Sequence, residues 1–132
     1  MKRLFYILFF LFSFANVFSQ SDTTELYTVV EEMPQFPGGN DKLMMFIAEN
    51  INYPNEAKES GCQGKVFVKF VVGVNGVVYD KQVLKSGGCS AIDKEALRVL
   101  GLMPTWTPGK QNGIPVRVAY MLPVNFQLKR GK

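Results

Sequence analysis

Few side chains in this 132-residue chain could act as nucleophiles, redox groups or metal ligands. The sequence contains no histidine, and its two cysteines, Cys62 and Cys89, do not form a C-x-x-C pair. Zinc sites and thioredoxin-type redox sites both need more of these residues. We therefore predict no metal and no cofactor, and we interpret the cysteines as a structural disulfide of an exported protein.

General acid–base and nucleophilic chemistry also lack their usual groups. Ser86 and Ser90 have no evident base, and a serine without an activating base is a weak nucleophile. Asp93 and Glu95 are two residues apart on a predicted helix, which places their carboxylates on different faces. The sequence therefore predicts a protein that is not an enzyme and that works through a binding surface.

Residues 1–19 have the pattern of an export signal. Lys2 and Arg3 precede an apolar stretch that runs to Phe18. We predict cleavage before Gln20, and the alternative is an uncleaved anchor in the inner membrane. Without Lys2 and Arg3 the remaining basic residues nearly balance the 11 acidic ones, so no nucleic-acid partner is expected.

The mature chain then divides into two parts. Residues 20–40 form a flexible N-terminal segment with one short strand at Leu26–Val30, and residues 41–132 form a single domain. Apolar residues at helical spacing predict a first helix over Asp41–Ile51, with Asn40 as its N-cap.

Two more helices follow from the pattern. A short helix is predicted between Pro54 and Gly61, and a longer one over Ala91–Leu102 begins with a capping-box pattern, Ser90-Ala91-Ile92-Asp93. Three methionines near these helices are interpreted as core-filling side chains: Met44, Met45 and Met103.

Two apolar, β-branched runs within residues 64–86 flank Asn75-Gly76 and predict a β-hairpin. Partners across a two-residue turn at 75 and 76 have numbers that sum to 151, and so do Cys62 and Cys89. A three-residue turn changes this sum by one and still leaves the cysteines close together. The hairpin therefore supports a Cys62–Cys89 disulfide.

The alternating pattern of residues 115–128 predicts a third strand. A right-handed crossover gives a three-stranded antiparallel sheet in the order 2-1-3, with this strand at an edge. Pro115 and Pro123 agree with an edge position, since proline has no N–H for a ladder. Because the two prolines are eight residues apart, both missing N–H groups lie on the same side of the strand, which must be the outer side. The N–H groups of odd-numbered residues should therefore point outward.

An exposed edge of this kind has two interpretations. It is protected against unwanted pairing, for which Arg117 and the two prolines are common devices, or it is a docking site for an extended peptide. The residues alone leave both interpretations open.

The chain resembles the TonB C-terminal domain family, in the form found in Bacteroidetes. Three stretches over about Tyr53–Leu128 carry the similarity: "NYPNEAKESGCQGKVFVKFVVGVNGVV", "IDKEALRVLGLMPTWTPGKQNGIPVRV" and "LPVNFQL". The resemblance implies that the domain works in the periplasm and has an α+β fold. This fold is a two-layer α/β sandwich with two main helices packed on one face of the small sheet.

The resemblance also implies a function in TonB-dependent transport, in which the domain binds the extended TonB box of an outer-membrane receptor as an added strand. Asn52, Tyr53 and Pro54 match the tail of a family motif that lies close to the receptor. Trp106 matches the tryptophan before Pro-Gly-Lys and is expected as a core anchor. The implied pairing edge is Arg117, Val118, Ala119, Tyr120, Met121 and Leu122.

The sequence departs from full-length transducers in two ways. It has no long proline-rich, charged spacer, and its N-terminal segment has no histidine. Energy transduction with inner-membrane motor proteins requires that this segment is retained, and it therefore stands as one alternative. The others are a free periplasmic binding or structural module, cell-wall-associated or regulatory, and a homodimer formed by edge-to-edge pairing.

Overall fold

The computed structural model describes residues 25–128, so the predicted signal segment and its cleavage site lie outside the described residues. The elements in chain order are β1 (Leu26–Tyr27), α2 (Asn40–Asn50), α3 (Asn55–Ser60), β2 (Gly64–Val72), β3 (Val78–Lys85), α4 (Ser90–Leu100), β4 (Gly109–Gln111) and β5 (Ile114–Phe126).

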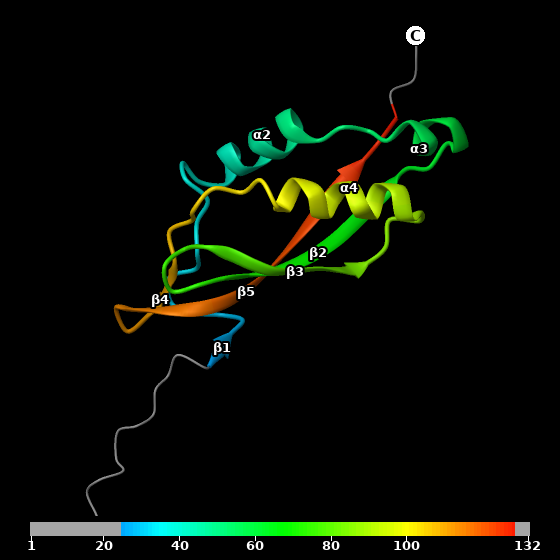
Figure 1. The fold of residues 1–132 in the computed structure, drawn as a ribbon. Helices are drawn as coiled ribbons and strands as arrows, with labels where there is room; N and C mark the ends of the chain where they lie inside the picture. The colour runs from blue at the N-terminus through cyan, green and yellow to red at the C-terminus, as the bar shows by residue number, and fades with distance from the viewer. Residues whose placement is uncertain (1–24, 129–132) are drawn as a thin grey trace, which may run out of the picture.

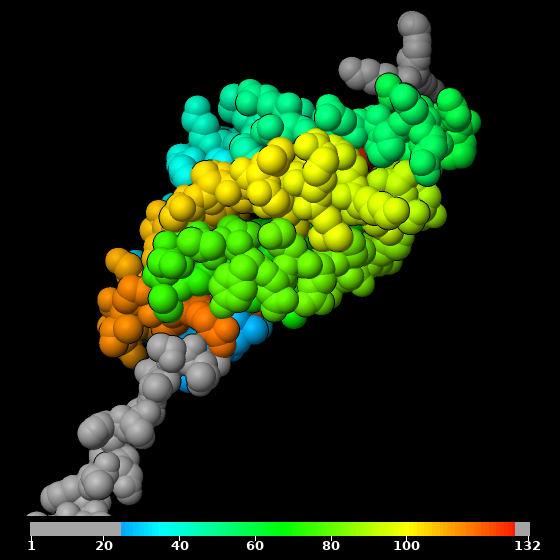
Figure 2. Space-filling view, viewed as in Figure 1, coloured from blue at the N-terminus to red at the C-terminus, as the bar shows by residue number. Residues whose placement is uncertain are grey.

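The helices lie together on one face of a twisted sheet (Figure 1). α4 packs against β2 and β3, and Figure 2 shows α4 lying directly against the hairpin. Along β5 the even-numbered side chains from Val118 to Phe126 face the helices, and the odd-numbered ones face the open side. The α+β class is therefore confirmed. The core between the layers includes Leu43, Ile47, Val66, Val68, Phe70, Ile92, Ala96, Val99, Leu122 and Val124.

The sheet has more strands than the sequence predicts. Its order is β1-β5-β2-β3, with β4 also paired to β5. The predicted order 2-1-3 corresponds to β3-β2-β5 and is present, with β2 antiparallel to both neighbours. The prediction of only three strands, all antiparallel, was wrong because β1 and β4 join the sheet, β1 in parallel.

β4 forms a short hairpin with the beginning of β5. Asn112 and Gly113 take positive φ values of 54° and 77° and connect Gln111 to its partner Ile114. The sequence shows this region as a turn, since a strand of three residues is too short to display a period.

Residues 25–39 are attached to the domain by backbone hydrogen bonds. Glu32 and Lys110 exchange two of them, at 3.1 and 2.8 Å, and so do Gln35 and Thr107, at 3.0 and 2.8 Å. The segment that we expected to be flexible is thus paired with the chain around β4 over its described part. Three of its described residues are buried: Val30, Pro34 and Phe36.

The predicted N-terminal caps of the two longer helices are wrong. Asn40 is the first residue of α2 and makes no capping bond, while α4 is preceded by Cys89 as its N-cap. The expected capping box fails because the carboxylate of Asp93 accepts hydrogen bonds from Ser86 Oγ at 2.6 Å and from the N–H of Gly87 at 2.8 Å. Asp93 therefore holds the loop between β3 and α4.

The hairpin and the disulfide are both present. Gly73 donates its N–H to the carbonyl oxygen of Val77 at 2.9 Å, across a three-residue turn. Gly61 ends α3 with a φ of 75°, as predicted. Cys62 and Cys89 lie beyond the β2–β3 ladder, yet their Cα atoms are 6.6 Å apart and the sulfurs are bonded. The disulfide thus joins the C-terminal end of α3 to the N-terminal end of α4.

Trp106 lies at the centre of an aromatic cluster and is 2% exposed. Its ring meets Phe36, Phe70 and Tyr120 edge to face, with centroids 5.7, 5.4 and 5.1 Å away. Its backbone N–H donates to the carbonyl oxygen of Gly76 at 2.8 Å, and a Cβ at Gly76 would stand 2.0 Å from the Trp106 carbonyl oxygen. The residue expected as a core anchor therefore joins the N-terminal segment, the hairpin tip and β5.

A buried carboxylate on α4 fixes the linker between α2 and α3. Glu95 accepts the N–H of Asn52 at 2.6 Å and two hydrogen bonds from Arg98, each 2.8 Å. Arg98 also donates to the carbonyl oxygen of Asn50 at 2.7 Å. The hydrogen bonds from Arg98, together with that from Asn52, hold the pKa of Glu95 below its ordinary value although burial opposes this.

Replacing both cysteines by serine should lower the free energy of unfolding by about 3 kcal/mol, because the bond closes a loop with a sequence separation of 27. Urea denaturation of the oxidised protein and of the Cys62→Ser/Cys89→Ser variant measures this. Reduction of the unsubstituted protein should cause a similar loss. Coincident unfolding curves for oxidised protein and variant would contradict a stabilising disulfide.

Glu95 should make the stability depend on pH in the acid range. Because its pKa is lower in the folded than in the unfolded chain, its contribution is present above its unfolded pKa and is lost as the pH falls through the folded one. Glu95→Gln should cost about 1–3 kcal/mol at pH 7 and weaken this acid dependence. Thermal melts from pH 7 to pH 3 test it, with exposed Glu59→Gln as the control; equal losses for both variants would refute it.

Candidate functional site

The two sides of β5 differ in their hydrogen bonding. β2 pairs with β5 over residues 118–126. The N–H of Gly73 faces β3, so that of Val72 faces β5, because successive N–H groups in a strand point to opposite sides. Val72 lies opposite Val118, and even-numbered residues of β5 therefore bond to β2. Odd-numbered groups face outward, including Pro123, which has no N–H to offer.

β1 divides the predicted pairing edge. It lies in parallel opposite Arg117 and Val118, the first two of the predicted positions. Among the described strands none pairs with the outer side of β5 from Ala119 to Phe126. We call this stretch, residues 119–126, the free edge. It contains the other four predicted positions and extends beyond them.

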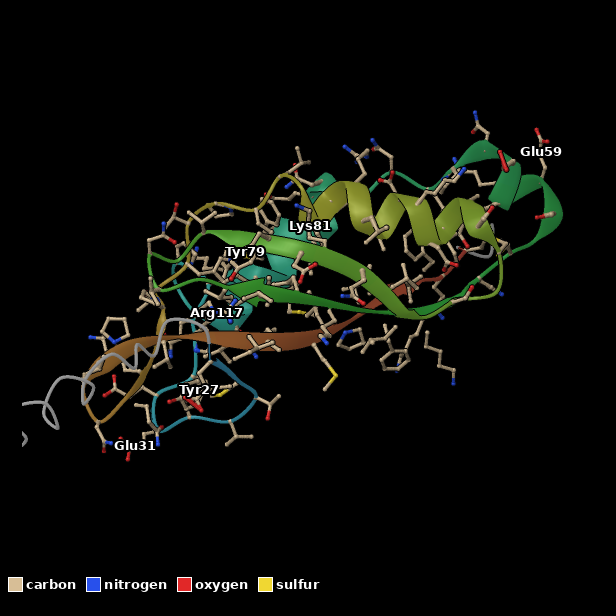
Figure 3. The ribbon with its side chains drawn as sticks, turned by 60° about the horizontal axis from the view of Figure 1, so that its bottom comes forward. Tyr27, Glu31, Glu59, Tyr79, Lys81 and Arg117 are labelled. Atoms are coloured by element: carbon tan, nitrogen blue, oxygen red, sulfur yellow. A yellow bond between two sulfur atoms is a disulfide. The ribbon has the colours of Figure 1, made fainter. Side chains whose placement is uncertain are left out.

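The side chain of Arg117 lies on the open face of the sheet and makes a contact within the domain. Its Nη1 donates to the hydroxyl oxygen of Tyr79 on β3 at 3.1 Å, and Figure 3 shows these two side chains together, with Tyr27 of β1 nearby. Val71, which pairs with Tyr79, is only 3% exposed although no helix covers this face. Arg117 thus helps to cover the sheet and does not belong to the free edge.

Side chains of the free edge alternate between the two faces. Met121 is 64% exposed on the open face, whereas Leu122 is 5% exposed on the helical face. Ala119 and Tyr120 are half-buried. A strand added here would form backbone hydrogen bonds with the odd-numbered residues, and its own side chains would alternate in the same way.

Two hollows lie on the helical side of this edge. One of about 340 Å³ is lined by residues of the N-terminal segment and α2 together with Tyr120. The other, of about 780 Å³, lies between α2 and the end of β5, and we call it the α2–β5 cleft. Its lining residues are Met44, Ile47, Ala48, Ile51, Tyr53, Lys65, Pro123, Val124, Asn125, Phe126 and Gln127.

The Asn52-Tyr53-Pro54 motif connects α4 to the end of the free edge at Phe126. Asn52 is held by Glu95, as described above. The Tyr53 hydroxyl donates to the carbonyl oxygen of Cys62, and its ring packs edge to face on Phe126 at 5.6 Å. Burial raises the pKa of the Tyr53 hydroxyl. Pro54 is the N-cap of α3.

Sequence patterns alone did not predict the cleft. Met44 and Met45 were interpreted as core-filling residues, but they are 52% and 49% exposed, so that interpretation was wrong. Helical spacing already argued against a core role for both, because Leu43 and Ile47 define the buried face of α2, while Met44 lies beside that face and Met45 opposite it. Only the three-dimensional arrangement brings Met44 next to Val124.

Within residues 25–128 there is no group of three or more Cys, His, Asp or Glu side chains that could hold a metal ion. Over the same range no helix is long and apolar enough to cross a membrane. Asp93 and Glu95, with separate partners, do not form an acid–base pair.

Comparisons with known proteins agree on one family. Residues 49–128 match the model described as Gram-negative bacterial TonB protein C-terminal. The chain is 33% identical over 79 residues to Protein TonB of Haemophilus influenzae, a match that covers 58% of this chain and 29% of that protein. Two solution structures of the Helicobacter pylori TonB C-terminal domain are similar. One, of residues 179–285, has a TM-score of 0.52 and 25% identity, and the match covers 72% of this chain and 89% of that one. The other, of residues 194–285, has a TM-score of 0.53 and 26% identity, and the match covers 69% of this chain and 95% of that one. The chain therefore belongs to the TonB C-terminal domain family, which is associated with TonB-dependent transport.

Proposed function

We propose that this protein binds the extended TonB-box segment of outer-membrane receptors by strand addition along the free edge of β5, in TonB-dependent transport. The observation that carries the proposal is the outer side of β5 from Ala119 onward, where no described strand pairs, while the other side pairs with β2 over residues 118–126. Outward N–H and C=O groups provide affinity for any extended backbone, and side-chain contacts provide selectivity.

β1 supports the proposal because it already uses this edge. It shows the kind of contact that a guest strand would make, an extended backbone in parallel beside Arg117 and Val118. A guest that begins at Ala119 would continue this line, and a longer guest would have to displace β1. Pro123 limits the bonding at the far end, since it offers only its carbonyl group.

The Asn52-Tyr53-Pro54 motif is consistent with a receptor-binding role near the same edge. Tyr53 forms part of the α2–β5 cleft and contacts Phe126 at the end of β5. In this proposal the motif acts through position, because its hydrogen bonds are made within the domain. A receptor segment that follows the free edge would pass beside Tyr53.

Other parts of the function rest on the relatives. The chain spans 29% of the length of the Haemophilus influenzae protein, so energy transduction by this chain, with motor proteins at the inner membrane, is itself a proposal. The second proposal is a free binding or structural module of the periplasm that occupies receptors without transmitting force. A homodimer paired along the two free edges would use the same surface and would compete with receptor peptides.

Met121→Pro should reduce binding of TonB-box peptides at least tenfold, because it removes an outward N–H and obstructs the guest backbone. Pairing with β2 should survive, since Met121 has the same parity as Pro123. Calorimetry with synthetic TonB-box peptides from receptors of the same genome measures the effect, and Met121→Ala, which keeps the N–H, should bind within about threefold of the unsubstituted protein. Equal binding by both variants would place the site elsewhere. A dimer in light scattering that peptide does not dissociate would favour edge-to-edge pairing.

Export should produce a soluble protein that begins at Gln20. Intact mass measurement of the periplasmic fraction gives the cleavage point, and a gain of two hydrogens on reduction shows the disulfide. A full-length chain recovered with the inner membrane would instead support the anchored alternative.

A further inference from the structure

We propose that the α2–β5 cleft is a pocket that selects a large apolar side chain in the strand bound at the free edge. The inference rests on the proposed function and adds the chemistry of the guest residue. It concerns the end of the free edge between Leu122 and Phe126, and the side of the cleft that α2 forms.

Strand geometry directs a guest side chain into this cleft. Residues directly opposite each other in paired strands project their side chains to the same face of the sheet. Val124 projects toward the helices and is 2% exposed, so the guest residue opposite Val124 must also project to the helical face. There it meets the cleft between β5 and α2, which Val124 itself lines.

The wall of the cleft is apolar where the side chain would enter. Met44, Ile47 and Ala48 face it from α2, and Tyr53 and Phe126 close its end. Met44 is 52% exposed, so an occupant of the cleft could cover its side chain. A volume of about 780 Å³ accommodates an aromatic or branched aliphatic side chain with the neighbouring backbone.

An extended peptide fits the cleft better than a small apolar molecule does. Pro123 and Asn125 belong both to the cleft and to the outward-facing set of β5, so an occupant lies beside carbonyl groups that need hydrogen-bond donors. A peptide backbone supplies those donors while its side chain fills the apolar space. Continuity with the edge that already holds β1 supports the same occupant.

This pocket depends on a part of the chain outside the family match. The match begins at residue 49, whereas Met44, Ile47 and Ala48 precede it. The wall formed by α2 therefore lies before the matched region, whereas the free edge lies within it.

Adjacent methionines provide a matched test. Met44 lines the cleft and Met45, of similar exposure, does not. Met44→Asp and Met45→Asp carry the same substitution on the same helix, so only the first should place a carboxylate in the pocket. The probes are a bound TonB-box peptide and its single alanine variants at each apolar position, with affinities measured by calorimetry.

One alanine variant should bind the unsubstituted protein and Met45→Asp about tenfold more weakly than the parent peptide. On Met44→Asp that difference should fall below about threefold, the coupling expected for two groups in contact. Ala48→Trp, which fills the cleft from the same wall, should have the same effect, with exposed Glu49→Trp as its control. Thermal melts identify any variant that does not fold.

The outcomes separate this inference from the function on which it rests. If peptides bind and Met121→Pro abolishes binding, but no alanine variant distinguishes Met44→Asp from Met45→Asp, the pocket is refuted and strand addition stands. If no TonB-box peptide binds, the proposed function fails and the inference with it. If Met44→Asp dissociates a dimer of the free protein, a second copy occupies the cleft and the proposal is overturned.

Discussion

The pairing of β5 with β2 determines how every other part of the domain is arranged. Because side chains alternate along a strand, this register sends Val118, Leu122 and Val124 into the core and leaves Met121 in solvent. A shift by one residue would exchange these two sets. It would also turn the missing N–H of Pro123 toward β2, so the proline and the apolar pattern enforce the same register.

The sequence predicted what local patterns encode. Alternation identified the strands, Asn75-Gly76 the hairpin and Gly61 the end of a helix, while simple register arithmetic brought Cys62 and Cys89 together. These features depend on neighbouring residues or on one turn. The prediction of the disulfide assumed a two-residue turn, and the hairpin has a three-residue one. The pairing of Cys62 with Cys89 holds nevertheless, because both cysteines lie beyond the β2–β3 ladder.

The errors of sequence reasoning concern contacts between distant segments. A short strand was predicted at Leu26–Val30, where β1 is present, but its pairing with β5 was not. β4, of three residues, was not predicted at all. Asp93 leaves its expected capping role because Ser86 and Gly87 come within reach. The outward direction of the odd-numbered N–H groups of β5 could be inferred from the spacing of its prolines. The pairing of β1 with Arg117 and Val118, and the cleft beside the end of β5, depend on the arrangement in space.

Residues before the family match are built into the domain. Phe36 packs on Trp106, β1 lies beside β5, and α2 forms one wall of the cleft. Residues before position 49 therefore lie next to β5 at Arg117 and Val118 and again beside the end of the strand.

The brevity of the uncovered run also bears on solubility. Long, flat strand edges template the growth of fibrous assemblies, because each added chain exposes a new edge like the last. Here β1 covers one end of the outer side and Pro123 interrupts the other. The stretch that no described strand covers is short, so it offers a poor template for stacking copies of the protein.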